Sequence, residues 1–280
     1  MARLLYKGIV VMEKEIEAIE KMEIREDDIW VCTFPRSGTT MTQEMVYLIQ
    51  TLDFDTANKV QLDERFPILE VKDKRFPYYR GVTYIEQLKS PRMIKTHLHH
   101  SLLPEQLQRG KGKIIYMVRN PKDVITSFWR FMQWEGMGML KHYVNSFIDG
   151  TGYGCPWPRH VLEYWERRND KQLLFLKYED VVRDRPSAIQ RIAEFLGRSL
   201  NDDEVLRISE HCKVDNMRRN SMVNLSYWRN FKYLDDSSVY AFINKGQPGA
   251  WRDVLTPDQS TKIDQLIQQL EKYGLEIEDT

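Results

Sequence analysis

Residues 29–40 constrain the fold of this chain more than any other stretch. They read Ile-Trp-Val-Cys-Thr-Phe-Pro-Arg-Ser-Gly-Thr-Thr, and the mostly apolar start predicts a buried strand. A short loop follows, and residues 41–52 then show the pattern of a helix. The first N–H groups of a helix lack intrahelical partners, and the helix dipole is positive there, so such a turn suits a phosphate group. We therefore predict an α/β fold with a P-loop-like phosphate-binding strand, loop and helix.

The side chains of the loop add to its anion-binding character. Gly38 lets the backbone approach a ligand closely, and Arg36 offers a forked cation. Ser37, Thr39 and Thr40 add hydroxyl donors. The loop is not a Walker A motif, because the pattern Gly-x-x-x-x-Gly-Lys-Ser/Thr is absent. An ordinary strand-to-helix turn is the alternative interpretation.

Length and charge narrow the class of protein. A chain of 280 residues suits one large α/β domain, and we predict a single domain over residues 1–280. Lys plus Arg number 41 and Asp plus Glu number 41, so the formal net charge is zero. This balance predicts neither nucleic acid nor a membrane as a partner. An anionic ligand must instead be held by cations gathered locally.

The cysteines and the apolar segments bear on location. Cys32, Cys155 and Cys212 are an odd and widely spaced set without a CxxC pair, which predicts a reducing compartment and no metal site. No segment has the length and apolarity of a membrane span, and the start of the chain lacks a signal-peptide pattern. We expect a cytoplasmic protein.

Predicted strands alternate with predicted helices along the chain, which indicates a parallel sheet with helices on both faces. We expect strands at 29–33, 92–95, 113–118 and 172–177, and helices at 41–52, 121–133, 158–168, 186–196, 202–211 and 257–273. Residues 132–158 and 220–247 are aromatic and Gly-rich, and we interpret them as irregular loops that can cover a pocket. Ligands of such sheets bind beyond the carboxyl ends of the strands, where residues 35–40, 96–99, 119–123 and 178–180 are expected to meet.

Two further segments at this edge carry chemistry. His97 follows the second strand beside Lys95, which suits a general base next to a charge-stabilising cation. Arg119 ends the third strand and Ser127 lies two turns into the following helix, as a second phosphate would require. The alternatives are a structural histidine and an Arg119–Asp123 pair at a helix start.

The order of these motifs resembles that of a cytosolic sulfotransferase over residues 21–273. The marks are residues 35–40, 95–97, 119–123 with Ser127, 178–180, 195–197, and 245–246 followed by Trp251. Residues 62–67 resemble arthropod members of the family. The resemblance implies transfer of a sulfuryl group from 3′-phosphoadenosine 5′-phosphosulfate to an acceptor hydroxyl or amine, without a metal.

The resemblance also implies roles for particular residues. His97 would be the general base, and Lys95, Arg36 and Ser127 would complete the catalytic set. Arg119 and Ser127 would hold the 3′-phosphate of the donor. The residues expected to contact the nucleotide are Arg36, Ser37, Gly38, Thr39, Thr40, Met41, Arg119, Ser127, Tyr178, Cys212, Met217, Phe242, Asn244, Lys245 and Gly246.

The sequence departs from the family pattern at several of these positions. The family usually has Lys at Arg36, an aromatic residue at Met41 and Arg at Asn244. These changes keep open a member that binds ligands but catalyses poorly. The usual dimer motif is poorly matched because Pro257 and Thr261 replace its Val and Glu, so we do not predict that homodimer. A small-molecule kinase is a third hypothesis, but it would need Mg²⁺ ligands and a loop Lys-Ser/Thr pair.

Aromatic side chains predict an apolar pocket for a small-molecule acceptor. The composition suits a phenol, sterol, retinoid or similar small apolar alcohol, and dehydration through transient sulfonation stays open for an acceptor that loses the new group. The expected pocket residues are Phe66, Phe76, Tyr78, His97, Phe131, Trp134, Phe147 and Tyr233.

Overall fold

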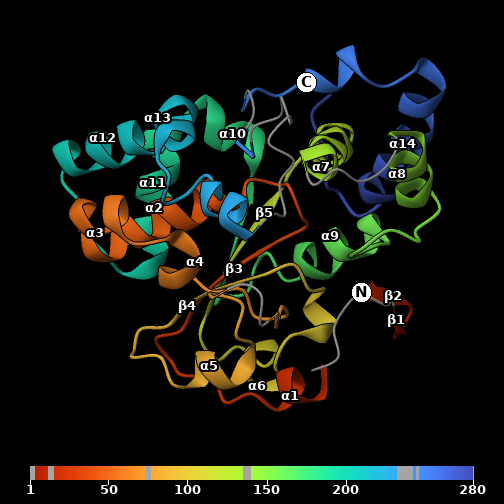
Figure 1. The fold of residues 1–280 in the computed structure, drawn as a ribbon. Coiled ribbons are helices and arrows are strands. Elements are labelled where there is room, and N and C mark those ends of the chain that lie inside the picture. The colour runs from red at the N-terminus through yellow and green to blue at the C-terminus, as the bar shows by residue number, and fades with distance from the viewer. Residues whose placement is uncertain are drawn as a thin grey trace.

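A parallel four-stranded sheet in the order β4-β3-β5-β6 lies at the centre of the molecule (Figure 1). The computed structural model describes residues 4–11, 16–73, 77–134, 140–231, 242–243 and 246–279. The strands are β3 (Ile29–Thr33), β4 (Met93–Thr96), β5 (Lys113–Val118) and β6 (Leu173–Lys177). Their bounds match the predicted strands to within a residue, and the predicted α/β class with a central parallel sheet is confirmed.

Helices cover both faces of the sheet (Figure 1). Alternate residues of β3 enter opposite cores: Val31 packs with one set of helices, and Trp30 and Cys32 pack with the other. All of β3 is buried, as expected for a parallel strand with both faces covered. The core around Val31 includes α2 (Thr39–Thr51), α11 (Arg185–Leu196) and α12 (Asp202–His211), and the core around Trp30 includes α7 (Pro121–Trp134), α8 (Leu140–Ile148), α9 (Trp157–Trp165) and α14 (Pro257–Glu271).

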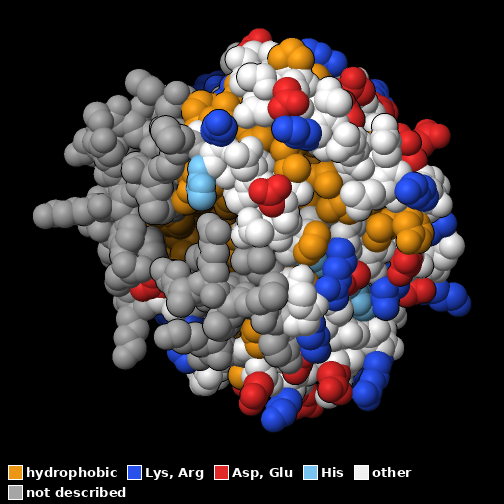
Figure 2. Space-filling model, turned by 90° about the vertical axis from the view of Figure 1, so that its right-hand side faces the viewer, with side chains coloured by type: hydrophobic (Ala, Val, Ile, Leu, Met, Phe, Trp, Pro, Cys, Tyr) orange, Lys and Arg blue, Asp and Glu red, His pale blue; other side chains and the backbone are white. Residues whose placement is uncertain are grey.

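Short elements connect this frame. They are β1 (Leu4–Tyr6), β2 (Ile9–Val11), α1 (Ile16–Lys21), α3 (Phe54–Lys59), α4 (Leu62–Arg65), α5 (Val82–Glu86), η1 (His100–Leu102), α6 (Glu105–Gln108), α10 (Tyr178–Arg183), α13 (Val214–Arg219), η2 (Ser226–Phe231) and η3 (Ala250–Asp253). Within the described residues, every helix is too short or too polar to span a bilayer. On the face seen in Figure 2, basic and acidic side chains are interspersed, in keeping with the balanced charge of the chain.

Local sequence explains three helix starts and two departures from prediction. Pro121 opens α7, and Pro158 and Pro186 lie in the first turns of α9 and α11, where a missing N–H costs nothing. Helix α9 ends at Trp165 rather than Arg168, because the amides of Arg167 and Arg168 bond three residues back and tighten the chain into turns. Residues 132–158, predicted as irregular, contain α8, whose apolar residues at helical spacing pack into the core.

The amino-terminal edge of the sheet is held by a buried ion pair. Arg92 donates from Nε to Asp28 Oδ1 at 2.7 Å and from Nη2 to Asp28 Oδ2, and a further bond reaches the Glu23 carbonyl at 2.8 Å. The side chains of Arg92 and Asp28 are 1% and 0% exposed. Removing one partner of such a pair leaves an uncompensated charge in the interior, which is more costly than losing a surface ion pair.

We expect Arg92→Met to lower the free energy of unfolding by about 3–5 kcal/mol, because Asp28 keeps its buried charge. The matched control is Arg109→Met, whose pair with Glu105 is exposed and is expected to be worth about 0–1 kcal/mol. Urea unfolding of both variants measures the difference. Equal losses in the two variants would show that burial of the Arg92 pair carries no special weight.

Candidate active site

The predicted phosphate-binding turn forms where β3 ends. Gly38 has a left-handed backbone with φ of 99° and lies at the N-cap of α2, which begins without a side-chain cap. Within the described residues, the first amides of this helix therefore have no capping side chain. A Cβ atom on Gly38 would lie 2.7 Å from Cδ2 of Tyr178, so this aromatic ring closes one side of the turn. Tyr178 begins α10 directly after β6, so this contact brings the carboxyl ends of β3 and β6 together.

Two buried polar atoms at this turn have unused hydrogen-bonding capacity. Among the described residues, no hydrogen-bond partner lies near Ser37 Oγ or Arg119 Nε. Buried polar atoms are normally satisfied, so unsatisfied donors beside an uncapped helix start indicate a place for an anionic group. The residues present thus fit a phosphate-bearing ligand.

Arg36 lies across the turn and points toward α7. Its backbone is left-handed, with φ of 70°. Nε donates to Ser127 Oγ at 3.2 Å, and Nη2 donates to the Phe242 carbonyl at 2.8 Å. The guanidinium carbon lies 5.0 Å from the ring centre of Phe131 and 4.7 Å from that of Phe242, so aromatic faces flank the cation.

Arg119 shares the same edge. Its Nη1 donates to the Arg36 carbonyl at 3.2 Å, and its guanidinium lies 4.4 Å from the ring centre of Tyr178. Arg119 Nη2 lies 3.9 Å from Asp123 Oδ2. The Asp123 carboxylate instead accepts hydrogen bonds from the amides of Gly249 and Trp251 at 2.8 Å and 3.2 Å. The ion pair considered as an alternative therefore forms only as a long contact. The Arg119 side chain thus contacts the main chain of Arg36, and the two segments lie at one edge of the sheet.

His97 lies beyond β4 with its tautomer set by the main chain of β3. Its Nδ1 lies 2.9 Å from the Thr33 carbonyl oxygen, which can only accept, so Nδ1 carries the proton and neutral His97 keeps a lone pair on Nε2. Burial, followed by the charges of Lys95 and Arg36, lowers the pKa of His97 from 6.5 to about 4. The imidazole is therefore neutral at physiological pH, the state that a general base requires.

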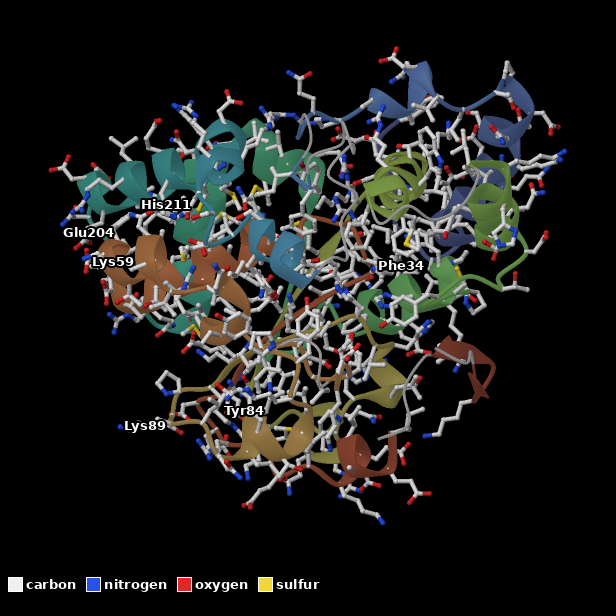
Figure 3. The ribbon with its side chains drawn as sticks, in the orientation of Figure 1. Phe34, Lys59, Tyr84, Lys89, Glu204 and His211 are labelled. Carbon is white, nitrogen blue, oxygen red and sulfur yellow. The ribbon has the colours of Figure 1, made fainter. Side chains whose placement is uncertain are left out.

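The main chain of His97 is also fixed from both sides. Its amide donates to Glu70 Oε1 at 2.7 Å, and its carbonyl accepts from His160 Nε2 at 3.2 Å. His160 in turn accepts from the Tyr116 hydroxyl at 2.9 Å through Nδ1. Phe34, labelled in Figure 3, packs edge-on against the His160 ring at 5.4 Å. Glu70 and His160 thus hold the main chain of His97, and within the described part of the chain no hydrogen bond involves its Nε2.

Lys95 is paired rather than free. Its Nζ donates to Asp63 Oδ1 at 2.6 Å, and the side chains of Lys95 and Asp63 are 13% and 1% exposed. Asp63, Glu70 and Thr33 were not among the predicted site residues. Asp63 belongs to the charged run Leu62-Asp63-Glu64-Arg65, which is indistinguishable from a solvated helix face in the sequence.

The remaining expected nucleotide contacts divide into three groups. Tyr178 donates to the Gly246 carbonyl at 3.0 Å, and Gly246 packs so closely on α13 that a Cβ would lie 2.8 Å from Val214. Met41, Met217 and Cys212 are buried in the core around Val31, and burial raises the pKa of the Cys212 thiol well above its ordinary value. Asn244 and Lys245 lie outside the described residues.

The predicted acceptor residues are only partly gathered. Phe131 packs against Trp228 and Phe242 at 6.0 Å and 5.8 Å, and Tyr78 packs against Tyr227 at 5.4 Å. Two others are enclosed in the cores: Phe66 is 0% exposed, and Phe147 packs against Phe34. Phe76, Tyr233 and the side chain of Trp134 lie outside the described part of the structure.

The fold and the site together define an α/β enzyme class that binds a phosphorylated ligand at one sheet edge and places a neutral histidine beside it. A family model described as a sulfotransferase domain matches residues 26–275. Human Sulfotransferase 4A1 is 34% identical over 264 residues, which cover 91% of this chain and 84% of that protein. Amine sulfotransferase from Oryctolagus cuniculus is 32% identical over 275 residues, with coverage of 94% and 87%.

Comparison with solved structures points to the same family. Retinol dehydratase in complex with androsterone and the inactive cofactor PAP superposes with a TM-score of 0.86 at 30% identity, covering 94% of this chain and 87% of that one. The chain therefore belongs to the sulfotransferase family, and it is a sulfotransferase. The family and the enzyme class expected from the sequence are confirmed.

We expect Gly38→Ala to destabilise the fold more than Gly197→Ala. Both glycines have left-handed backbones, so each substitution costs about 1–2 kcal/mol in backbone strain. A Cβ at Gly197 meets nothing within 4 Å, whereas one at Gly38 collides with the Tyr178 ring. Thermal unfolding of both variants measures the excess, and equal losses would contradict the close approach of Tyr178 to the turn.

Proposed function

We propose that this protein transfers a sulfuryl group from 3′-phosphoadenosine 5′-phosphosulfate to the hydroxyl of a small apolar alcohol, with His97 as the general base and without a metal. The observation that carries the proposal is the shared edge at which the Arg119 guanidinium donates to the Arg36 carbonyl, with His97 near enough for the charge of Arg36 to lower its pKa. The structures of retinol dehydratase with PAP support the donor. The buried cysteines suit the cytoplasm, where we place this activity.

The donor has anionic groups at both ends of its nucleotide, and each would need a cation. The loop of residues 36–41 would hold the 5′-phosphosulfate end, and Arg119 with Ser127 would hold the 3′-phosphate. Tyr178 would contact the adenine, with residues 212–217 and 242–246 completing the nucleotide site. When bound, this donor would supply the sulfuryl group for transfer. Ser37 Oγ and Arg119 Nε are the unsatisfied donors available to it.

His97 would take the proton of the acceptor hydroxyl. The Thr33 carbonyl holds Nδ1–H, so the proton would go to Nε2. An alkanol is a weak acid and needs such a base, and a positioned base contributes about 10²–10⁴-fold to a rate. Lys95 and Arg36 would stabilise negative charge that develops during transfer, as fixed cations do in phosphoryl transfer.

The acceptor would lie against aromatic side chains. The cluster that contains Trp228, Phe131 and Phe242 adjoins the Arg36 guanidinium, and Tyr78 with Tyr227 lies near Asp63, the partner of Lys95. Apolar faces next to the reacting groups suit a phenol, a sterol or a retinoid. The structures of retinol dehydratase with androsterone and with retinol support an acceptor of this class.

The test is transfer of labelled sulfate to a panel of phenols, sterols and retinoids by wild type and His97→Ala. We expect His97→Ala to lower kcat for an alkanol about a hundredfold or more, because the base is lost. Nucleotide affinity, measured by titration with 3′-phosphoadenosine 5′-phosphate, should stay near that of wild type. Equal turnover in the two proteins would show that His97 is not the base.

The pH profile provides an independent prediction. Because the pKa of His97 is lowered to about 4, neutral His97 persists far below the ordinary value of 6.5. We expect kcat/KM to fall in acid with a midpoint near pH 4 rather than near 6.5, and the acid limb should disappear in His97→Ala. A limb centred near 6.5 would contradict the buried, cation-flanked site.

A dehydratase outcome is favoured by one observation, the likeness to retinol dehydratase at TM-scores of 0.86 and 0.85. For an allylic alcohol, loss of sulfate after transfer, together with a proton from an adjacent carbon, would form a further C=C bond. Product analysis separates the two outcomes, since a sulfate ester retains the label and elimination releases it as inorganic sulfate. The same assay with chelator tests the proposed absence of a metal, because a Mg²⁺-dependent transfer stops and the proposed reaction continues.

Arg36 stands where the family usually has lysine, and we expect Arg36→Lys to retain or raise kcat. An arginine can neutralise charge on a bridging oxygen but cannot readily give up a proton, whereas an ammonium can do both. Steady-state kinetics with a saturating alcohol measures the change. A loss of about a hundredfold would show instead that the guanidinium fork, which bonds Ser127 and the Phe242 carbonyl, is required.

A further inference from the structure

We propose that Asp63 is a positioning residue for Lys95, holding its ammonium at the edge of the sheet where transfer takes place. This inference rests on the role proposed above for Lys95. The effect of Asp63 would pass through the lysine rather than through contact with the reacting atoms.

Both oxygens of the Asp63 carboxylate accept hydrogen bonds. Lys95 Nζ donates to Oδ1 at 2.6 Å, and the Tyr227 and Tyr79 hydroxyls donate to Oδ2 at 2.6 Å and 3.4 Å. Burial and the charge of Asp63 raise the pKa of both tyrosines, so they remain donors at neutral pH. A charge-assisted bond of this length restricts the ammonium to one position, which a flexible lysine side chain would not otherwise keep.

Asp63 is itself rigidly placed. It lies on α4, whose Arg65 forms a buried ion pair with Glu44 of α2. Gln43, also of α2, donates to the Phe66 carbonyl at 3.1 Å, where α4 ends. The phosphate-binding turn opens α2, so the carboxylate that holds Lys95 and the turn expected to hold the donor are carried by the same packed unit. His211 Nε2 donates to Glu44 Oε2 at 2.9 Å and extends this unit to α12, where Figure 3 labels His211.

The segment that follows α4 also fixes the carboxyl end of β4. The Lys95 amide donates to the Pro67 carbonyl at 3.0 Å, and the Lys95 carbonyl accepts from the Leu69 amide at 2.9 Å. Glu70 then accepts from Thr96 Oγ1 at 2.8 Å and from the His97 amide at 2.7 Å. Residues 63–70 therefore present one buried carboxylate to the side chain of Lys95 and another to the main chain of His97. This pairing in order along both segments is what distinguishes Asp63 from an isolated ion pair.

A positioning role predicts a loss in kcat rather than in nucleotide binding. Asp63→Asn keeps the size and an acceptor oxygen but removes the charge, so the ammonium is no longer held in place. We expect kcat to fall about 10- to 100-fold, with the KM for the donor changed by less than about threefold. The matched control is Asp55→Asn, which removes an exposed pair with Lys59 and should leave kcat unchanged.

A double-mutant cycle separates positioning from general stability. Once Lys95→Ala is present, adding Asp63→Asn should cost no further kcat, because the residue through which Asp63 acts is gone. The same addition should raise the melting temperature of Lys95→Ala, since it removes a buried carboxylate without its partner. The double variant has neither charge, so it folds even where a single variant does not. Titration with 3′-phosphoadenosine 5′-phosphate verifies the nucleotide site in each.

The outcomes are distinct for the two proposals. If Lys95→Ala is impaired and Asp63→Asn adds nothing to that loss, the positioning role is supported. If Lys95→Ala is impaired but Asp63→Asn multiplies the loss, or alone leaves kcat unchanged, the positioning role is overturned and the proposed function stands. If Lys95→Ala keeps the full kcat, the role of Lys95 fails and the inference about Asp63 fails with it.

Discussion

The parallel register of three strands is the constraint on which the rest of the structure depends. Val31 of β3 lies beside Lys95 of β4 and Ile115 of β5, so the carboxyl ends of the strands fall at one edge. That coincidence allows Thr33 to hold the imidazole of His97 and allows Arg119 to reach the Arg36 carbonyl. A shift of register by one residue would turn each of these side chains to the opposite face of the sheet.

Buried charge is used differently at the two edges of the sheet. At the amino edge, Arg92 and Asp28 satisfy each other and the neighbouring main chain. At the carboxyl edge, Lys95 is held by Asp63 while Arg119 stacks on Tyr178 with one donor unsatisfied. Taking charges out of water is costly unless they are paired, so a buried cationic site needs carboxylates and aromatic faces around it. This arrangement lets a chain of zero net charge gather cations at one place.

Prediction from sequence worked best where the signal is local. The apolar run at 29–33 and the small-residue loop after it identify a buried strand and an anion-binding turn from adjacent residues alone, and the structure has both. It worked least well for aromatic residues. Phe131 lies beside Arg36, whereas Phe66 and Phe147 are packed in the cores, because the same side chain suits a pocket wall and a core equally. Helix α8 was missed for a related reason, since its apolar spacing lies within an aromatic stretch that resembles a loop.

The sequence by itself determined the strands, the phosphate-binding turn and the order in which basic residues follow successive strands, because each depends on neighbouring residues. Only the tertiary structure decided which nitrogen of His97 carries the proton and which carboxylate holds Lys95. The first depends on a backbone carbonyl, which every residue possesses and no pattern of side chains announces. The second depends on the packing of α4 against α2, which brings Asp63 from a charged run of ordinary surface composition into the interior beside β4.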